Sequence, residues 1–447
     1  MNWVNKCKLP TIEAIKYNNN LCLSLNSLWT TLHSSFNTAL HRQVDINILD
    51  EIGNKQVTTW APFSKEEFKI AINSCNNSST PGLDKLSWNH LKSVLKHNDW
   101  LSNIITIANA YINLEYSPNH FKKSLTVIIS KPNKSLYDSP KSFKLIVLLN
   151  MLGKLIKKVI EERIQFHVAA NNFIHPSQLG GLKFKSMTDT GVALIHIIWS
   201  GWTKNKSTST LAFDISQFFP SLNHQLLMQI ICIVGLDTWV VNFFSNYLID
   251  RKTNYLWNSF SLPIFNINVG VGQGLALSPI LSALYLSPFL YILEKWLKNL
   301  KIPISTISFV DDGLLISQDK LFDMSNLHLF CSYNVMSNLL DKFGLIVEHL
   351  KTEVFHFSRS HSPFNPPPLN LSPLGGPILT LKNSWKYLSF IFNRKLTFHQ
   401  HINFYSNKVL SSVKCMKLLG NSSHSITPIQ RWLLYRSCIL TIALYSF

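Results

Sequence analysis

Apolar runs of two kinds alternate irregularly along the chain. SLTVII, STLAF and TISFV have the length of buried strands and end at polar or turn-forming residues. LNMLGKLIKKVIEERIQFHV instead repeats its apolar residues at helical spacing, and Ser64 followed by Glu67 predicts a capping box at the start of another helix. Strands and helices are mixed without strict alternation and without an internal repeat, which predicts an α+β fold.

The order of these patterns divides the chain into four expected parts. Residues 1–60 form a polar, Asn-rich lead-in that is predicted to be helical. Residues 61–205 and 206–395 carry the strands and most of the helices, and a proline-rich loop at 362–377 interrupts the second of these parts. Residues 396–447 are predicted to form amphipathic basic helices.

The charge balance predicts a polyanionic partner. Lys and Arg total 42 against 24 Asp and Glu, a formal net charge of +18 over 447 residues. Ten basic and three acidic residues fall between Lys122 and Arg163. Nucleic acid and an anionic membrane surface both fit this excess, and for the basic stretch alone a solvated helix face remains an equal alternative.

Cysteine usage and the N-terminal sequence predict a reducing, intracellular protein, without deciding between nucleus and cytoplasm. The seven cysteines are scattered and show no CxxC spacing, so neither a zinc site nor a redox motif is predicted. The first twenty residues lack the continuous apolar stretch of a secretory signal.

One apolar segment raises the alternative of a membrane span. Residues 253–293 carry no charge, and LALSPILSALYLSPFLYIL at 275–293 is nominally long enough to cross a bilayer. The segment contains two prolines and follows the glycine-rich turn VGVGQG, which favours a buried core helix. Stable membrane association is therefore not expected.

The stretch SFVDDG at 308–313 holds the candidate chemistry. Asp-Gly between apolar runs is typical of a tight hairpin turn, and alternation along a strand would let only one of Asp311 and Asp312 face a given site. Asp214 ends another apolar run about a hundred residues upstream, where a lone Asp is more often a helix cap. Carboxylates from separate strands are also what an enzyme that uses two metal ions requires.

Seven stretches in one order resemble the reverse transcriptase of LINE-type, non-LTR retrotransposons. The resemblance runs from about residue 79 to the C-terminus and implies a right-hand polymerase. Its fingers with part of the palm would lie at 61–205, the palm core at 206–395 and a truncated helical thumb at 396–447. The stretches are KPNKSLYDSPKSFKLIVLLNMLGKLIKKVI, HPSQLGGLKFKSMTD, AFDISQFFPSLNH, VGVGQGLALSPILSALYL, SFVDDG, FGLIVEHLKTEVFHF and WKYLSFIFNRKLTFHQHI.

The resemblance assigns a catalytic role to four residues. It implies that Asp214, Asp311 and Asp312 hold two Mg²⁺ ions, with Mn²⁺ as a substitute, while a primer 3′-hydroxyl attacks the α-phosphate of a dNTP. Lys351 is implied to protonate the leaving pyrophosphate. An RNA template and a DNA primer or target are the implied partners, together with an endonuclease encoded by the same element.

Six further residues are implied to bind the nucleotide or the primer. Phe219 would act as a steric gate that collides with a ribose 2′-hydroxyl. This gate favours DNA over RNA synthesis, and so does the sequence VDD, because an RNA-dependent RNA polymerase would be expected to have GDD. The others are Gln273 near the incoming nucleotide, Lys131 and Lys144 at the triphosphate, and Tyr387 with Leu388 as the primer grip. From the residues alone there are alternatives: Gln273 could be an ordinary turn residue, the two lysines solvated surface residues, and Tyr387 with Leu388 simple strand packing.

Departures from the family pattern predict a drifting copy, and the length predicts a fragment of a longer reading frame. An inactive nucleic-acid-binding remnant and, less favoured, a membrane-associated protein are the alternative functions. Lysine in place of arginine at 144 keeps the charge but loses the bidentate fork. The departures are Lys144-Leu145-Ile146 for Arg-Pro-Ile, Met187 for Thr, Leu275 for Ser and Ser389 for Gly.

Overall fold

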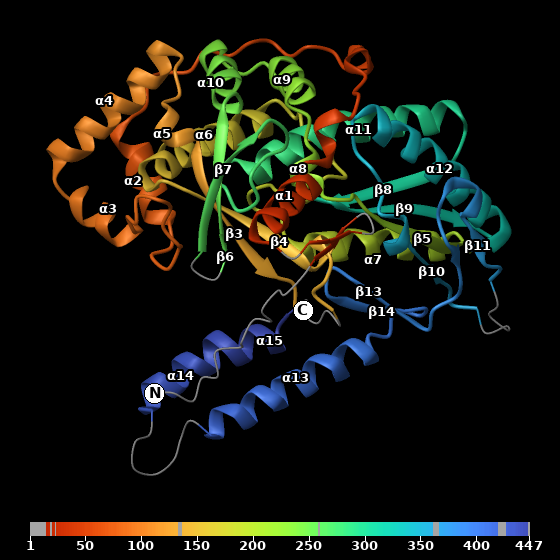
Figure 1. Cartoon of the computed structure of the whole chain (residues 1–447). Coiled ribbons are helices and arrows are strands. Elements are labelled where there is room, and N and C mark those ends of the chain that lie inside the picture. Colours follow the sequence, from red (N-terminus) through yellow and green to blue (C-terminus); the bar gives the residue numbers. More distant parts are fainter. Residues whose placement is uncertain are drawn as a thin grey trace. The chain divides into compact units, whose positions relative to one another are not determined.

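Two four-stranded sheets organise the computed structural model, one in each of two structural units (Figure 1). The structure describes residues 15–17, 20–22, 24–132, 136–257, 260–360, 366–418 and 426–445. The first unit comprises Met1–Lys183, Ile215–Lys295 and Met336–Val347. The second unit comprises Phe184–Asp214, Trp296–Val335 and Glu348–Phe447. The chain therefore passes repeatedly between the units.

The sheet of the first unit has the strand order β4-β3-β6-β7. β3 (Lys123–Ser130) and β4 (Phe143–Leu149) form the antiparallel pair that the sequence predicts on either side of the basic loop. β6 (Arg251–Trp257) runs parallel to β3 and continues into β7 (Phe260–Ile267) through a hairpin. The sheet buries an apolar cluster that consists of Ile15, Leu28, Trp29, Leu32, Ile128, Phe143 and Tyr255.

Helices surround this sheet in the first unit. The capping box predicted at Ser64 is present, because the Ser64 hydroxyl accepts from the Glu67 amide at 3.3 Å and the Glu67 carboxylate accepts from the Ser64 amide at 2.8 Å. The helices are α1 (Leu25–Phe36), α2 (Lys65–Ser74), α3 (Trp88–Val94), α4 (Asn98–Leu114), α5 (Asn119–Lys122), α6 (Met151–Ala170), α8 (Phe218–Ser221), α9 (His224–Ile233) and α10 (Thr238–Leu248). Short 3₁₀ turns are η1 (Thr38–His41), η2 (Ile46–Glu51) and η3 (Pro140–Ser142).

The lead-in that was predicted to be helical is only partly so. Residues 1–14 lie outside the described part, and the next residues form a strand pair, β1 (Ile15–Tyr17) with β2 (Asn20–Cys22). Ile15 is fully buried in the apolar cluster. Tertiary packing of this kind overrides local propensity, so the polar composition of the lead-in misled the prediction.

The long apolar segment forms helix α11 (Ser278–Asn299). It is the helix in the described ranges that is long and apolar enough to cross a membrane, and 78% of its most apolar stretch is buried inside the protein. Its buried hydroxyls have protein partners, since Ser278 Oγ donates to the Gly272 carbonyl at 2.6 Å and Ser282 Oγ donates to the Pro279 carbonyl at 2.6 Å. These features are those of the expected core helix.

The sheet of the second unit is antiparallel throughout, with the strand order β10-β5-β9-β8. Its strands are β5 (Ser207–Asp214), β8 (Ile304–Phe309), β9 (Asp312–Asp319) and β10 (Glu353–Phe357). Gln318 on β9 donates to the Ile197 carbonyl in α7 (Met187–Thr203), whereas Ser317 bonds to His328 in α12 (Phe322–Lys342). Because successive strand residues point to opposite faces, α7 and the first part of α12 cover the two faces of this sheet.

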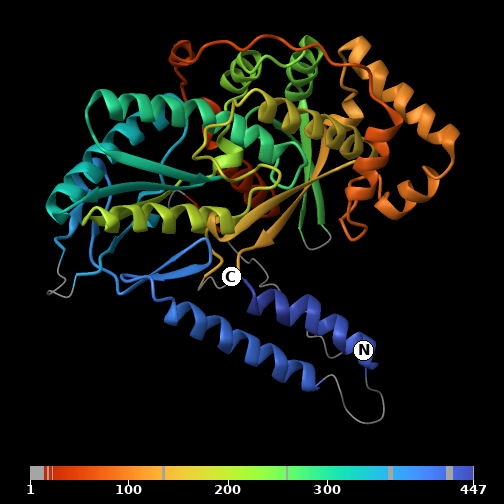
Figure 2. The same ribbon diagram turned by 180° about the vertical axis from the view of Figure 1, so that it is seen from behind.

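The second unit ends in a hairpin and a group of helices (Figure 2). The proline-rich stretch contains the two-residue strand β11 (Leu369–Asn370) and η5 (Ser372–Leu374), and the two-residue strand β12 (Ile378–Leu379) follows directly after it. β13 (Ser384–Tyr387) pairs with β14 (Phe390–Asn393), and helix α13 (His399–Leu418) follows. The last elements, predicted as helices, are α14 (Pro428–Leu434), the π-helix η6 (Tyr435–Leu440) and α15 (Thr441–Ala443).

Candidate active site at the end of the second sheet

Three aspartates meet at one end of the sheet in the second unit. Asp214 is the last residue of β5, and its register partner on the neighbouring strand is Asp312, the first residue of β9. Asp311 precedes Asp312 in the turn between β8 and β9. The fold thus joins carboxylates that are about a hundred residues apart in the sequence.

The turn that carries these aspartates differs from the Asp-Gly turn that the sequence favours. Phe309 pairs with Asp312, so the two turn residues are Val310 and Asp311, and Val310 has a φ of 60°. This left-handed conformation is rare for a β-branched residue. Asp311 therefore lies in the turn, outside the alternation of the strands, and its charge acts on both Asp312 and Lys351.

Gly313 serves close packing rather than the turn. It lies within β9 opposite Phe213, and a Cβ at this position would approach Cζ of the Phe213 ring to 2.2 Å. A glycine inside a strand often marks such a close approach. The phenyl ring beneath Gly313 explains why the DDG triplet mimics a turn signal without forming one.

The three carboxylates repel one another. Asp312 is mostly buried, and burial together with the charges of Asp311 and Asp214 raises its pKa to about 7, against the weaker opposing effect of Lys351. A carboxyl group with a pKa so far from its usual value is typical of functional sites. The cluster stores unfavourable charge that a bound cation would relieve.

Lys351 supplies positive charge to this cluster. It ends the 3₁₀ turn η4 (His349–Lys351) and forms an ion pair with Asp214. Burial lowers the pKa of Lys351, but the bond to Asp214 and the nearby carboxylates outweigh burial and raise it overall. The segment that carries Lys351 is anchored, since the Glu348 amide donates to the Asp214 carbonyl at 2.9 Å and Tyr333 Oη lies 2.7 Å from His349 Nδ1.

The donor set fits a divalent cation. Oxygen ligands from carboxylates suit Mg²⁺, and several carboxylates are needed to balance two such ions. Across the ranges that the structure covers, no group of three or more His, Cys, Asp or Glu side chains is arranged as a finished metal site. The Asp214 carboxylate instead pairs with Lys351, so the ammonium group provides the compensating charge in this structure.

Tyr387 belongs to the same site. Its side chain is buried at the end of β13, and its ring stacks on Trp385 at 5.1 Å. Burial and the charge of Asp312 raise the pKa of Tyr387 well above its ordinary value. Its hydroxyl has no hydrogen-bond partner within the part of the chain that the structure describes. Leu388 follows in the hairpin turn with a φ of 44°.

The other predicted site residues lie in the first unit. Phe219 is half-buried in α8, and its carbonyl accepts from the Val271 amide at 2.8 Å. The Gln273 carbonyl accepts from the Val147 amide in β4 at 2.9 Å. Lys144 is exposed on β4, and Lys131 Nζ donates to the Lys141 carbonyl at 2.8 Å. The fold therefore joins the steric-gate candidate and the glycine-rich turn to the sheet that carries the basic loop.

Two of the departures from the family pattern have a packing explanation. Leu275 is buried in an apolar cluster with Val147 and Leu149. Leu145 packs against the main cluster of the first unit and pairs with Ile128 in the β3–β4 ladder. An apolar side chain gains burial at both positions, and leucine at 145 keeps the N–H group that proline would lack.

Two basic side chains that the sequence did not single out form hydrogen bonds to the backbone of the glycine-rich turn. Arg251 Nη1 and His224 Nε2 each donate to the Gly270 carbonyl at 2.8 Å. Burial, followed by the charge of Arg251, lowers the pKa of His224 to about 4. Gly270 has a φ of 74°, and a Cβ there would come within 2.5 Å of the Pro220 carbonyl. Arg251 borders the long uncharged stretch, but nothing in the sequence distinguishes it from a surface arginine.

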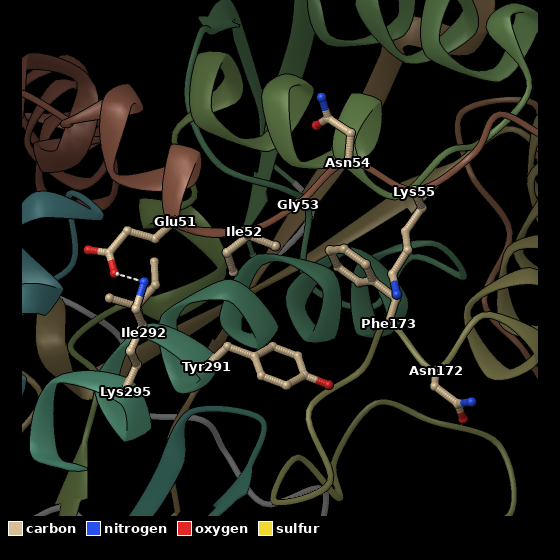
Figure 3. A pocket seen from close by; sticks show the side chains of 10 residues that line it. All are labelled: Glu51, Ile52, Gly53, Asn54, Lys55, Asn172, Phe173, Tyr291, Ile292 and Lys295. Atoms are coloured by element: carbon tan, nitrogen blue, oxygen red, sulfur yellow. Dashed lines mark ion pairs between the residues drawn. The ribbon is translucent and has the colours of Figure 1, made fainter. Parts of the chain in front are cut away.

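A separate cavity in the first unit contains none of the predicted site residues (Figure 3). It has a volume of about 500 Å³ and lies between the end of η2, the loop after α6 and helix α11. Glu51 and Lys295 form an ion pair of 2.9 Å at its edge, and Tyr291 and Lys55 contribute further side chains. The carboxyl group of Asp312, whose pKa is raised to about 7, lies in the aspartate cluster and not at this cavity, which favours the cluster as the functional site.

Sequence comparison identifies the class of protein that this site defines. The profile of the family described as reverse transcriptase (RNA-dependent DNA polymerase) matches residues 129–392, more than half of the chain. The chain belongs to the reverse transcriptase family. Its fold is accordingly the expected right-hand polymerase, and polymerases of this family generally use divalent metal ions.

Two curated relatives confirm the resemblance to non-LTR retrotransposons. The probable RNA-directed DNA polymerase from transposon BS of Drosophila melanogaster is 24% identical over 399 residues, which are 86% of this chain and 42% of the relative. The corresponding protein from the X-element of the same organism is 22% identical over 355 residues, 76% of this chain and 36% of the relative. The chain thus spans less than half the length of these relatives.

Two solved structures of telomerase from Candida tropicalis are also similar. The apo enzyme truncated from the C-terminal domain has a TM-score of 0.43 and 17% identity, covering 63% of this chain and 55% of its own. Telomerase in complex with a fragment of telomeric RNA has a TM-score of 0.45 and 14% identity, covering 82% of this chain and 60% of its own.

Proposed function

We propose that this chain catalyses RNA-directed DNA synthesis by transferring a nucleotide from a dNTP to a primer 3′-hydroxyl. The observation that carries the proposal is the meeting of Asp214, Asp311 and Asp312 at one end of the sheet, with the pKa of Asp312 raised to about 7. Membership of the reverse transcriptase family supports this assignment of the site. No comparable feature favours a membrane function.

The three aspartates would hold two Mg²⁺ ions, or Mn²⁺ in their place. Bound there, the ions would activate the attacking hydroxyl and stabilise charge on the leaving oxygen. In the reaction the primer 3′-hydroxyl releases its proton to solvent and its oxygen bonds to the α-phosphorus, while the bond from the α-phosphorus to the bridging oxygen breaks and pyrophosphate leaves. Lys351 is held in its protonated form by the ion pair with Asp214, and it would donate its proton to the leaving pyrophosphate.

The remaining predicted residues take supporting roles in this proposal. Lys131 and Lys144 would bind the triphosphate through charge-assisted hydrogen bonds, for which lysines beside a loop are suited. Phe219 would exclude the ribose 2′-hydroxyl, and Gln273 would contact the incoming nucleotide. Tyr387 and Leu388 would position the primer end beside Asp312, whose charge already reaches Tyr387.

The partners and the setting follow from the same proposal. An RNA template and a DNA primer or target fit the net charge of +18. Residues 61–205 would act as fingers with part of the palm, residues 206–395 as the palm core and residues 396–447 as the thumb. An endonuclease of the same element would nick the target. The six cysteines in the described ranges are free of disulfides, which suits the proposed reducing, intracellular compartment.

Primer extension distinguishes this function from that of an inactive nucleic-acid-binding remnant. We expect the purified chain to extend a labelled DNA primer on an RNA template with Mg²⁺ and four dNTPs, and to stop when EDTA is added. Binding of the primer-template, measured by anisotropy in parallel, should weaken steeply with salt because phosphate contacts release counterions. Salt-sensitive binding without any extension would identify the remnant and overturn the proposal.

A further inference from the structure

The hairpin turn between β13 and β14 has an unfavourable backbone. Tyr387 pairs with Phe390, so Leu388 and Ser389 are the two turn residues. Their φ angles are 44° and 69°. A two-residue turn with two positive φ angles normally requires glycine, asparagine or aspartate, because other side chains are strained there. Some other contact must therefore hold this turn.

Two tyrosines from the C-terminal elements contact the carbonyls of this turn. Tyr405 in α13 donates from its hydroxyl to the Ser389 carbonyl at 3.0 Å. Tyr445, after α15, places its hydroxyl 3.5 Å from the Leu388 carbonyl, a longer and weaker contact. The two rings stack with their centroids 5.4 Å apart, so they form one unit against the turn.

A histidine in α13 fixes the same hairpin one residue further along. The Ile391 amide donates to His401 Nδ1 at 3.2 Å, and the imidazole stacks on Phe390 and contacts Tyr405. Accepting at Nδ1 requires an unprotonated nitrogen, and burial lowers the pKa of His401 despite a bond to the Tyr445 backbone. Helix α13 thus forms hydrogen bonds with the hairpin at two places, the Leu388–Ser389 turn and strand β14.

Tyr445 also contacts the start of helix α7. Its hydroxyl lies 3.7 Å from Met187 Sδ as well as near the turn. Met187 is the first residue of α7. Tyr445 therefore contacts both the hairpin turn and a helix that covers one face of the second sheet.

We propose that Tyr405 and Tyr445 are positioning residues that clamp the Leu388–Ser389 turn to helix α13. The clamp holds a turn that its own residues disfavour, and it makes the hairpin and α13 move as one body. Trp385 of the hairpin stacks on Phe355 of β10 with ring centroids 5.8 Å apart, and β10 is the neighbour of β5, which ends at Asp214. The clamp therefore sets the position of the hairpin on the sheet that carries the aspartates. This role in primer positioning rests on the proposed polymerase function.

A double-mutant cycle between the clamp and the turn tests this proposal. Tyr405→Phe removes only the hydroxyl, and we expect it to raise KM for the primer-template about 2- to 10-fold, the effect of one lost hydrogen bond, with KM for dNTP unchanged. Ser389→Gly gives the turn a residue that tolerates a positive φ, so in that background Tyr405→Phe should have little effect. Tyr435→Phe, on the exposed face of η6, is the matched control and should resemble the parent.

Thermal unfolding of the same variants keeps this test independent of catalysis. Tyr405→Phe should lower Tm in the parent background and change it less in the Ser389→Gly background, whether or not the chain extends a primer. Equal losses of Tm in both backgrounds would overturn the clamp. If the parent extends primers but Tyr405→Phe leaves KM for the primer-template unchanged, the positioning role is wrong while the polymerase function stands.

Discussion

Asp312→Asn is expected to unfold at a higher temperature than the parent at pH 8. In the folded parent, Asp312 is surrounded by Asp311 and Asp214 and is largely withdrawn from water, so its ionised form is unfavourable. Asparagine has nearly the same shape and no charge. Removing the repulsion should raise the free energy of unfolding by roughly 2 to 4 kcal/mol, from a shift of about three pKa units at 1.36 kcal/mol each.

The pH dependence of this gain has a defined sign. The pKa of Asp312 rises from 3.8 to about 7 on folding, so between about pH 4 and pH 7 the folded state keeps a proton that the unfolded state releases. The free energy of unfolding contributed by this group is therefore fully present below pH 4 and is lost as the pH rises through 7. Asparagine does not titrate, so the gain in free energy of unfolding of Asp312→Asn over the parent should increase between about pH 4 and pH 7. Above pH 7 this gain should stay constant.

Melting curves from pH 4 to pH 8 measure this difference. Asp319→Asn is the matched control, because it removes a carboxylate from the other end of the same strand. Adding Mg²⁺ at pH 8 should raise Tm of the parent and of Asp319→Asn, and change Asp312→Asn much less, if the carboxylates bind the cation. If the difference in Tm between Asp312→Asn and the parent does not vary with pH, the pKa of Asp312 is not raised in the folded protein.

Phe219→Val is expected to admit ribonucleotides. The ring is half-buried at the start of the short helix α8, and the backbone is fixed because the Val271 amide donates to the Phe219 carbonyl. Shortening the side chain leaves this backbone contact in place and opens space where a 2′-hydroxyl would lie. We expect the ratio of kcat/KM for dNTP to that for rNTP to fall by about 100-fold, the upper range for a purely steric pocket.

Single-nucleotide incorporation with matched dNTP and rNTP measures this ratio. Phe219→Tyr keeps the ring and should retain most of the discrimination. The loss should come mainly from faster use of rNTP, because the contacts to a deoxyribose are largely kept. A ratio that stays at the parent value in Phe219→Val would remove Phe219 from the role of steric gate, although the role proposed for the aspartates would still stand.

The architecture could be predicted from the sequence wherever local patterns decide the structure. The capping box at Ser64, the β3–β4 pair around the basic loop and the buried helix α11 all follow from periodicity and cap chemistry. The strand at Ile15 could not be predicted, because its burial depends on Trp29 and Ile128, which lie elsewhere in the chain.

The site shows the same division between local and long-range information. That Asp214 pairs in register with Asp312 depends on strand pairing across a hundred residues, and only the resemblance to a family connected them in the sequence. The Asp-Gly signal was misleading, because the ring of Phe213 requires glycine at 313 for space. The hydrogen bonds of Arg251 and Tyr405 to backbone carbonyls carry no pattern that a single sequence reveals.

The most direct test of the central claim is incorporation of one dNTP onto a DNA primer opposite an RNA template, with primer-template binding measured in the same samples. We expect the parent and Asp319→Asn to incorporate the nucleotide. Asp312→Asn should bind the primer-template normally but lose at least about 1,000-fold in rate, because a group essential to transition-state stabilisation is removed. If Asp312→Asn incorporates the nucleotide at the parent rate, the aspartate cluster is not the catalytic centre.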